Sequence, residues 1–228
     1  MDPKQAAADR ALDEVKEGML LGLGTGSTAS YFVSGLGRRV AEGLRVTAVA
    51  TSQATAELAA SLDIRLLTSI DRAIDLTVDG ADEIDPQLNL IKGLGGALLR
   101  EKVVAAASKR MIVIAAADKL VPQLGSHAPV PVEVLSLLWE RTAAQLHELG
   151  LRPALRKLPS GAAFVSDNGN LILDCGFTPP RDLDALASGL DRLPGVLGHG
   201  LFLGIATTAI VGDPDGQVRV IAPASEGA

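Results

Sequence analysis

Residues 19–40 read M-L-L-G-L-G-T-G-S-T-A-S-Y-F-V-S-G-L-G-R-R-V and set the fold class of the chain. Residues 19–23 are an apolar run of strand length, and residues 29–40 have the spacing of an amphipathic helix. Between them lies a glycine-rich turn, residues 24–28, that carries three hydroxyl side chains. A strand, a glycine-rich turn and a helix direct backbone N–H groups toward an anion. We therefore predict an α/β fold with an anion site at this turn.

Three interpretations of the turn stay open. The first is a cradle for a single phosphate, built by Thr25, Gly26, Ser27 and Thr28, whose hydroxyls add hydrogen-bond donors. The second is a purely structural turn. The third is a dinucleotide site, which the sequence disfavours because no third glycine follows at the offset that this fingerprint requires. The turn also lacks the G-K-[ST] of a nucleotide P-loop.

Strand and helix patterns alternate through the first half of the chain. Further strands are predicted at residues 46–50, 64–67, 74–78 and 111–115, and helices at 4–17, 54–62 and 97–109. This order predicts a Rossmann-like open, mostly parallel sheet with helices on both faces. Polar residues recur where the predicted strands end, at Thr25–Thr28, Thr51, Asp79 with Asp82, and Lys119. Since ligands bind at the carboxyl edge of such sheets, we expect these side chains to meet there.

The second half has a different pattern. Strands are predicted at residues 129–134, 153–157, 164–165, 171–175 and 195–201, and helices at 136–149 and 183–192. The β-α-β-β-α-β order predicts a smaller ferredoxin-like α+β domain. Residues 203–211 and 218–221 form a predicted hairpin that returns to the first domain. The expected division is therefore a catalytic domain of residues 1–128 with 203–228, and a second domain of residues 129–202.

Composition excludes several classes of protein. The net charge of -6, with interspersed acidic residues, disfavours a nucleic-acid partner. No apolar run approaches the length of a membrane span, and the N-terminus is too polar for a signal peptide. The single cysteine, Cys175, fits a reducing compartment, and we expect a cytoplasmic protein in which Cys175 is a small buried strand residue rather than a nucleophile. The three histidines include no pair spaced for zinc, whereas magnesium at Asp79 and Asp82 stays open.

The segment from residue 79 to residue 102 holds the candidate chemistry. It reads D-G-A-D-E-I-D-P-Q-L-N-L-I-K-G-L-G-G-A-L-L-R-E-K. Glu101, at a helix start just after glycines, suits a general base, and Lys92 could stabilise a negatively charged oxygen. Each residue also has an ordinary interpretation, such as a solvated helix glutamate or a turn-forming aspartate. The catalytic interpretation of Glu101 and Lys92 depends on these side chains meeting at one edge of the sheet.

Five blocks occur in the order of a known family. They are G-L-G-T-G-S-T-A at 22–29, V-D-G-A-D-E-I at 78–84, K-G-L-G-G-A-L-L-R-E-K at 92–102, D-K-L-V at 118–121 and P-V-P-V-E-V at 129–134. Further matches are V-S-D-N-G-N-L-I-L-D at 165–174 and P-G-V…G-L-F within 194–202. Together they resemble the A-type ribose-5-phosphate isomerases over essentially the whole chain.

The resemblance implies interconversion of D-ribose 5-phosphate and D-ribulose 5-phosphate through an enediol(ate), in the non-oxidative branch of the pentose phosphate pathway. It implies that Glu101 is the proton acceptor, assisted by Asp79, Asp82 and Lys92, and that no cofactor or metal is needed. The substrate-binding positions implied are Thr25, Gly26, Ser27, Thr28, Asp79, Gly80, Ala81, Asp82, Lys92, Gly93, Leu94, Gly95 and Lys119. Lys4 is a weaker phosphate candidate. The family's members are dimers or tetramers, so a homodimer or homotetramer is expected.

Three rival functions remain at this point. An amino-sugar-phosphate deaminase would share the sheet and the cradle but act on an amino sugar. A non-catalytic sugar-phosphate sensor usually carries an added DNA-binding segment, for which the short N-terminus leaves no room. A dinucleotide oxidoreductase would bind a nicotinamide cofactor.

Overall fold

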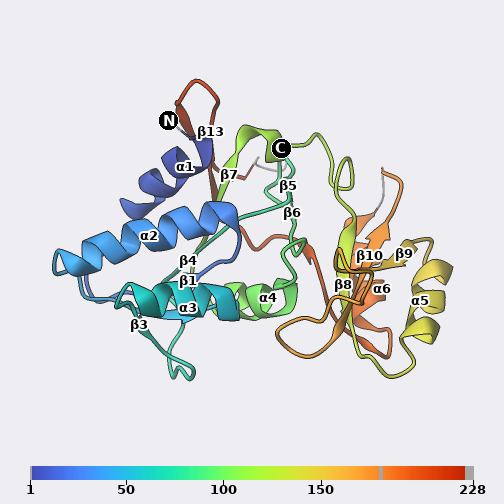
Figure 1. The fold of residues 1–228 in the computed structure, drawn as a ribbon. Helices are drawn as coiled ribbons and strands as arrows, with labels where there is room; N and C mark the ends of the chain where they lie inside the picture. The colour runs from blue at the N-terminus through green and yellow to red at the C-terminus, as the bar shows by residue number, and fades with distance from the viewer. Residues whose placement is uncertain (1, 180–181, 224–228) are drawn as a thin grey trace.

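The computed structural model describes residues 2–179 and 182–223, which form three β-sheets with flanking helices (Figure 1). The helices of this part of the chain are α1 (Pro3–Leu12), α2 (Ser27–Ala41), α3 (Gln53–Ser61), α4 (Leu98–Ala106), the 3-10 helix η1 (Ala117–Lys119), α5 (Trp139–Glu148) and α6 (Leu183–Asp191). No helix among these residues is both long enough and apolar enough to cross a membrane.

The largest sheet has seven strands in the order β14-β13-β7-β4-β1-β2-β3. Its strands are β1 (Leu20–Leu23), β2 (Thr47–Ala50), β3 (Arg65–Leu66), β4 (Leu76–Asp79), β7 (Met111–Ala116), β13 (Thr208–Gly212) and β14 (Val218–Ile221). All neighbouring pairs are parallel except β13 and β14, which form an antiparallel hairpin at one edge. The predicted Rossmann-like sheet is confirmed.

Helices cover both faces of this sheet, as strand β7 illustrates. Ile112 and Ile114 belong to a buried cluster with apolar residues of α1 and α2. Met111 and Val113 point to the other face and share a cluster with Ala105 of α4. Because successive strand residues face opposite sides, a strand buried on both faces reads as the uninterrupted apolar run seen here.

A four-stranded antiparallel sheet forms a second body, on the right in Figure 1. Its order is β11-β8-β10-β9, with strands β8 (Val130–Val134), β9 (Arg152–Leu155), β10 (Leu171–Gly176) and β11 (Val196–His199). Helix α5 follows β8 and helix α6 follows β10, which is the predicted ferredoxin-like arrangement. Cys175 is fully buried in β10, and burial raises the pKa of its thiol to about 12, as expected for a structural cysteine.

A small third sheet was not predicted. It has the order β12-β6-β5, with strands β5 (Glu83–Ile84), β6 (Leu90–Ile91) and β12 (Leu201–Phe202). The single strand predicted at residues 195–201 is therefore wrong, because it divides into β11 and β12. The division occurs at Gly200, whose N–H donates to the carbonyl of Pro131 in β8 at 2.7 Å. The Gly200 carbonyl accepts from the N–H of Lys92 at 2.9 Å.

Two other predicted strands also differ from the structure. The strand expected from residue 203 begins only at Thr208, and residues 164–165 contribute one isolated bridge, between Val165 and Leu171. The domain boundaries at residues 128/129 and 202/203 stay a prediction. Met1, residues 180–181 and residues 224–228 lie outside the described residues.

Candidate active site

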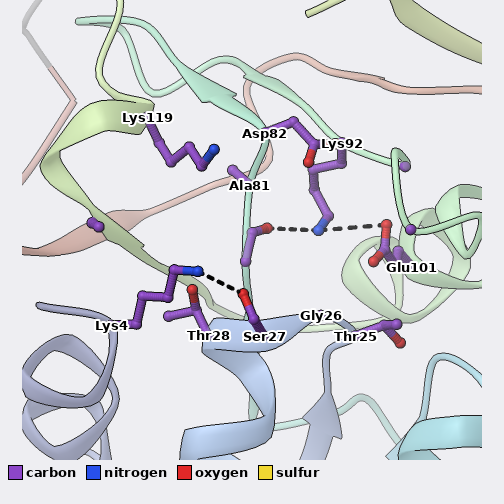
Figure 2. Close-up of a pocket in the computed structure, with 14 residues that line it drawn as sticks. Lys4, Thr25, Gly26, Ser27, Thr28, Ala81, Asp82, Lys92, Glu101 and Lys119 are labelled. Carbon is purple, nitrogen blue, oxygen red and sulfur yellow. Dashed lines mark hydrogen bonds and ion pairs between the residues drawn. The ribbon is translucent and has the colours of Figure 1, made fainter. Parts of the chain in front are cut away.

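The predicted site residues gather around one cavity of about 170 Å³ (Figure 2). Strands β1, β4 and β7 all end here, so the cavity lies at the carboxyl edge of the parallel sheet. The cavity is lined by Lys4, Thr25, Gly26, Ser27, Thr28, Gly80, Ala81, Asp82, Lys92, Gly93, Gly95, Glu101, Ala116 and Lys119. Of the positions proposed from the sequence, Asp79 and Leu94 are not part of the lining, and Ala116 joins the lining without having been predicted.

The cavity opens where β1 and β4 lie side by side. The chain leaves β1 toward β2 and β3, then returns to the opposite side of β1 as β4, which makes this the switch point of the sheet. Gly24, just after β1, donates its N–H to the carbonyl of Val78 at 2.9 Å. A Cβ on Gly24 would fall 2.1 Å from Oδ1 of Asp79, so only glycine allows the turn to pass this carboxylate.

Lys92 is the central charge of the site. Its Nζ lies 2.9 Å from Oδ2 of Asp79 and 3.4 Å from Oε2 of Glu101, and it donates to the carbonyl of Gly80 at 2.6 Å. The ammonium therefore takes the cationic position next to Asp79 that the magnesium alternative required. Burial lowers the pKa of Lys92, but the charges of Asp79 and Glu101 raise it by more, so the amine is held protonated.

A buried aromatic ring also contacts this lysine. Nζ of Lys92 lies 5.6 Å from the ring centre of Phe202, and Nζ of Lys102 lies 5.2 Å from the same centre. Phe202 belongs to β12, the strand that pairs with β6 immediately before Lys92. The G-L-F block marked this residue as part of a family pattern, but nothing in the pattern predicted its contact with the site.

Glu101 is only 4% exposed and lies in the first turn of α4, where Figure 2 shows it beside Lys92. Burial raises the pKa of its carboxyl group to about 8, and the negative charge of Asp79 adds to the increase while Lys92 opposes it. A carboxyl group with a pKa near the working pH can both accept and return a proton. Its location and its pKa fit the proton-transfer role.

Asp82 is held by the turn that follows β6. Its Oδ2 accepts the N–H of Leu94 at 2.9 Å, so Leu94 contributes backbone rather than side chain to the site. Burial raises the pKa of Asp82, opposed first by this hydrogen bond and then by the charge of Lys92. A second acidic group with a raised pKa thus borders the same cavity.

The other end of the cavity is basic. Lys4 donates from Nζ to Oγ of Ser27 at 3.0 Å, and Figure 2 shows Lys4, Thr28 and Ser27 side by side, away from Glu101. Lys119 enters the cavity from above them in this view, beside Ala81. Ser27 begins helix α2, whose first turn carries no acidic residue. Two lysines and a helix N-terminus suit a phosphate group.

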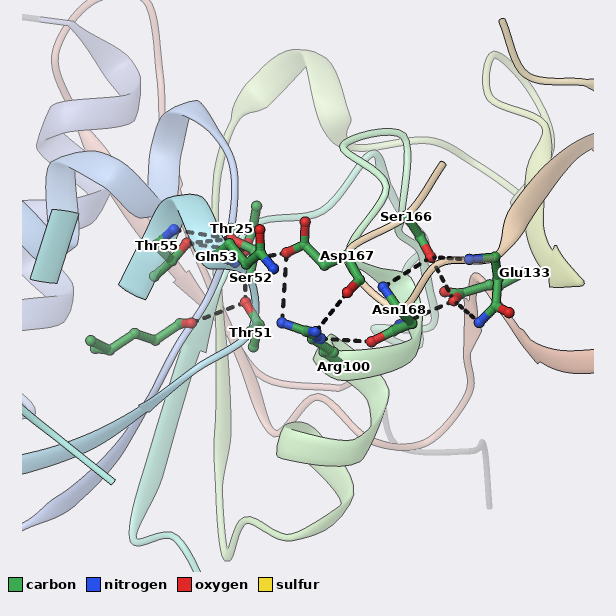
Figure 3. A network of polar contacts seen from close by, with 12 residues as sticks. Thr25, Thr51, Ser52, Gln53, Thr55, Arg100, Glu133, Ser166, Asp167 and Asn168 are labelled. Atoms are coloured by element: carbon green, nitrogen blue, oxygen red, sulfur yellow. Dashed lines mark hydrogen bonds and ion pairs between the residues drawn. The ribbon is translucent and has the colours of Figure 1, made fainter. Parts of the chain in front are cut away.

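Thr25 connects the cavity to a hydroxyl cluster (Figure 3). Its Oγ1 lies 2.7 Å from Oγ1 of Thr51, 2.8 Å from Oγ of Ser52 and 3.0 Å from Oγ1 of Thr55. Thr51 was expected to meet the other polar residues at the sheet edge, but it is buried behind Thr25, as is Ser52. They support the turn instead of lining the cavity.

The same network reaches the four-stranded body. Oδ2 of Asp167 accepts the N–H of Gln53, the first residue of α3, at 2.7 Å. Arg100, the neighbour of Glu101, donates from Nε to Oδ1 of Asn168 at 2.7 Å and from Nη2 to the carbonyl of Asp167 at 2.9 Å (Figure 3). The loop at residues 166–170 is therefore in contact with α4, which carries Glu101, and with α3, which carries Thr55 of the hydroxyl cluster.

Comparison with known proteins gives a consistent result. A family model described as ribose 5-phosphate isomerase A (phosphoriboisomerase A) matches residues 47–216. The chain is 53% identical to ribose-5-phosphate isomerase A of Roseiflexus sp. (strain RS-1) over 226 residues, which cover 97% of both chains.

Solved structures agree. The ribose 5-phosphate isomerase A of Methanocaldococcus jannaschii is 35% identical, with a TM-score of 0.91 over 96% of this chain and 97% of that one. A D-ribose-5-phosphate isomerase in complex with phospho-erythronic acid is 37% identical, with a TM-score of 0.92 over 97% of this chain and 100% of the other. The chain is an isomerase and belongs to the ribose 5-phosphate isomerase A family.

Proposed function

We propose that this chain interconverts D-ribose 5-phosphate and D-ribulose 5-phosphate through an enediolate, with Glu101 as the general base. The observation that carries the proposal is the position of Glu101, buried at one end of the cavity and 3.4 Å from the ammonium of Lys92. A carboxylate next to a buried cation is suited to removing a proton whose loss creates a negatively charged oxygen.

One base is enough for this isomerisation, because the proton that is removed from one carbon is later returned to the neighbouring carbon. The Glu101 carboxylate takes the proton from C2 of the open-chain aldose, and the electron pair of that C–H bond forms the C1–C2 double bond. The carbonyl oxygen at C1 becomes negatively charged and is then protonated from the hydroxyl at C2. Glu101 returns its proton to C1, which leaves a carbonyl at C2 and completes the ketose.

Lys92 and the two aspartates act on the oxygens. Lys92 stabilises the enediolate oxygen, since its Nζ stays charged between Asp79 and Glu101. Asp82 carries the proton of the anomeric hydroxyl to the ring oxygen as the C1–O4 bond of the furanose breaks. Asp79 is fully buried and holds Lys92 in place.

The phosphate occupies the opposite end, at Ser27 and Thr28, with Lys4 and Lys119 as counter-charges. The contacts with the phosphate then supply binding energy at a distance from the reacting carbons, and this energy helps to hold those carbons in position. Phospho-erythronic acid, present in the related complex, combines a phosphate with a planar anionic carboxylate that resembles an enediolate. We propose that it binds this chain with its carboxylate at Lys92.

A panel of substrates tests the function. The purified chain should isomerise ribose 5-phosphate, whereas unphosphorylated ribose should show kcat/KM reduced by about 1,000-fold or more because the phosphate end is empty. Glucosamine 6-phosphate should not be deaminated. Equal turnover of ribose, or faster reaction of the amino sugar, measured by NMR of the products, contradicts the proposal.

The pH dependence follows from the same carboxyl group. Since the base must be ionised and the pKa of Glu101 lies at about 8, kcat/KM should rise with pH from 6 to 9 with a midpoint near 8. Lys102 is the control, because burial lowers its pKa to about 8 as well and it lies outside the cavity wall. Lys102→Met should keep the midpoint, and a midpoint near the ordinary value for glutamate would contradict the assignment.

Further parts of the proposal concern the cellular setting. We propose that the chain works in the cytoplasm, in the non-oxidative branch of the pentose phosphate pathway. We also propose a homodimer or homotetramer. Large apolar side chains exposed on the single chain support assembly, since Val103 is 62%, Leu137 69% and Leu138 65% exposed.

A further inference from the structure

Arg156 joins the four-stranded body to the wall of the cavity. It follows strand β9, and its side chain is only 11% exposed. Its Nη1 donates to the carbonyl of Gly93 at 2.9 Å and to the carbonyl of Leu94 at 3.0 Å. Both carbonyls belong to the glycine-rich turn, residues 93–96, that contributes Gly93 and Gly95 to the lining.

The guanidinium is itself fixed by an acidic partner. Nε of Arg156 donates to Oδ2 of Asp174 at 2.9 Å, and Nη2 donates to Oδ1 of the same carboxylate. Asp174 lies in β10, next to β9 in the sheet. A two-pronged arginine–carboxylate pair sets the plane of the guanidinium, so the direction of Nη1 is determined by the sheet.

An aromatic ring holds the far end of the turn. Phe164 lies under the Arg156 guanidinium, with 5.7 Å between Cζ and the ring centre, and donates its N–H to the Arg156 carbonyl at 2.9 Å. Gly96 has a φ of +87°, and a Cβ there would fall 2.5 Å from Cζ of Phe164. The turn is thus packed against the ring at one end and hydrogen-bonded to the guanidinium at the other.

The peptide between Gly93 and Leu94 links Arg156 to Asp82. Its carbonyl accepts from Arg156, and its N–H donates to Oδ2 of Asp82 at 2.9 Å. Because the peptide is planar, fixing the carbonyl also fixes the direction of the N–H. Hydrogen bonds at the two ends of one amide also strengthen each other.

We propose that Arg156 is a positioning residue of the isomerase site: through the Gly93–Leu94 peptide it orients the carboxylate of Asp82 and sets the shape of the turn. It acts behind the cavity wall and does not touch the substrate. The inference depends on the proposed function, in which Asp82 moves protons between sugar oxygens. It also gives the four-stranded body a direct part in building the site.

Three variants and one control test this role. Arg156→Met removes both the charge and the donors, and Arg156→Lys keeps the charge but loses the planar fork. Asp174→Asn keeps Arg156 and weakens its orientation. Arg152→Met is the matched control, since Arg152 begins strand β9, which Arg156 follows, but donates to Thr178 and Phe177 within its own body.

The expected result is a loss in turnover. Arg156→Met should lower kcat by about 10- to 100-fold, the size of effect that a displacement of roughly an ångström produces. The KM for ribose 5-phosphate should change by less than about threefold, because the phosphate end is untouched. Asp174→Asn should show a smaller loss of the same kind, and Arg152→Met should keep the wild-type kcat.

A pH profile separates positioning from general loss of structure. The charge of Arg156 helps to lower the pKa of Asp82 against the larger effect of burial, so Arg156→Met should shift the Asp82 step in the kcat profile to higher pH. Arg156→Lys should return that step toward the wild-type position while kcat stays low. A purely structural defect would instead reduce the number of sites that bind phospho-erythronic acid in calorimetry, with kcat per site unchanged.

The outcomes also distinguish this inference from the proposed function. If the Arg156→Met and Asp174→Asn variants isomerise ribose 5-phosphate with the wild-type kcat, only the role of Arg156 is overturned. The role of Arg156 is also overturned if the variants lose kcat only in proportion to the number of phospho-erythronic acid sites that they lose. Failure of the wild-type chain to isomerise ribose 5-phosphate would overturn the proposed function itself.

Discussion

Replacing Glu101 with glutamine should leave the chain folded and reduce kcat for ribose 5-phosphate by about 100- to 10,000-fold. Glutamine has nearly the same shape but cannot accept the proton from carbon, and general-base catalysis contributes an acceleration of about this size. The phosphate end of the cavity is unchanged, so binding of phospho-erythronic acid should persist. Turnover is measured by NMR, and binding by calorimetry.

A second measurement on Glu101→Gln concerns stability. Burial raises the pKa of Glu101 to about 8, so the folded protein holds this proton more tightly than the unfolded chain does. The stability that this provides is fully present below the ordinary pKa of glutamate, near 4.5, and is lost as pH rises through 8. Glutamine does not ionise, so the free energy of unfolding of the variant should increase relative to that of the wild type as pH increases across this window.

Glu57→Gln is the control, because Glu57 is an exposed residue of α3. It should keep wild-type turnover and wild-type pH dependence of stability. If Glu101→Gln retains kcat within about tenfold of the wild type, another group removes the proton. If binding of phospho-erythronic acid is lost along with turnover, Glu101 supports the cavity rather than the chemistry.

Local patterns were enough to predict where the candidate site residues meet. The strand, glycine-rich turn and helix at residues 19–40 require a parallel sheet, and the carboxyl edge of such a sheet collects the residues that follow each strand. This logic needs no long-range information, so it correctly brought Thr28, Asp82 and Lys119 to one cavity.

What could not be predicted depends on contacts between distant segments. Strands β5, β6 and β12 have two residues each, too few for a periodic pattern, and the pairing of β6 with β12 joins residues more than 100 positions apart. The contact of Arg156 with Gly93 spans 63 positions and involves carbonyl groups, which carry no sequence signature. Leu94 was predicted by its place in a motif, but its N–H rather than its side chain contacts Asp82.

Lys92→Met should abolish measurable turnover and also destabilise the fold. The Lys92 ammonium is the positive partner of a fully buried Asp79 and lies next to a buried Glu101. Removing one member of a buried ion pair leaves an uncompensated charge and costs about 3–5 kcal/mol. Thermal unfolding should occur at a lower temperature, and kcat should fall by about 1,000-fold or more because, in the proposed mechanism, the enediolate loses its cation.

A double variant separates these two effects. Lys92→Met with Asp79→Asn removes both charges of the pair, so most of the lost stability should return while turnover stays absent. Lys102→Met is the matched control, since Lys102 faces the same Phe202 ring from outside the cavity wall. It should keep normal turnover. If the double variant regained both stability and turnover, Lys92 would serve only to neutralise Asp79. Stabilisation of the proposed enediolate would then have to come from another cation of the cavity lining, such as Lys119.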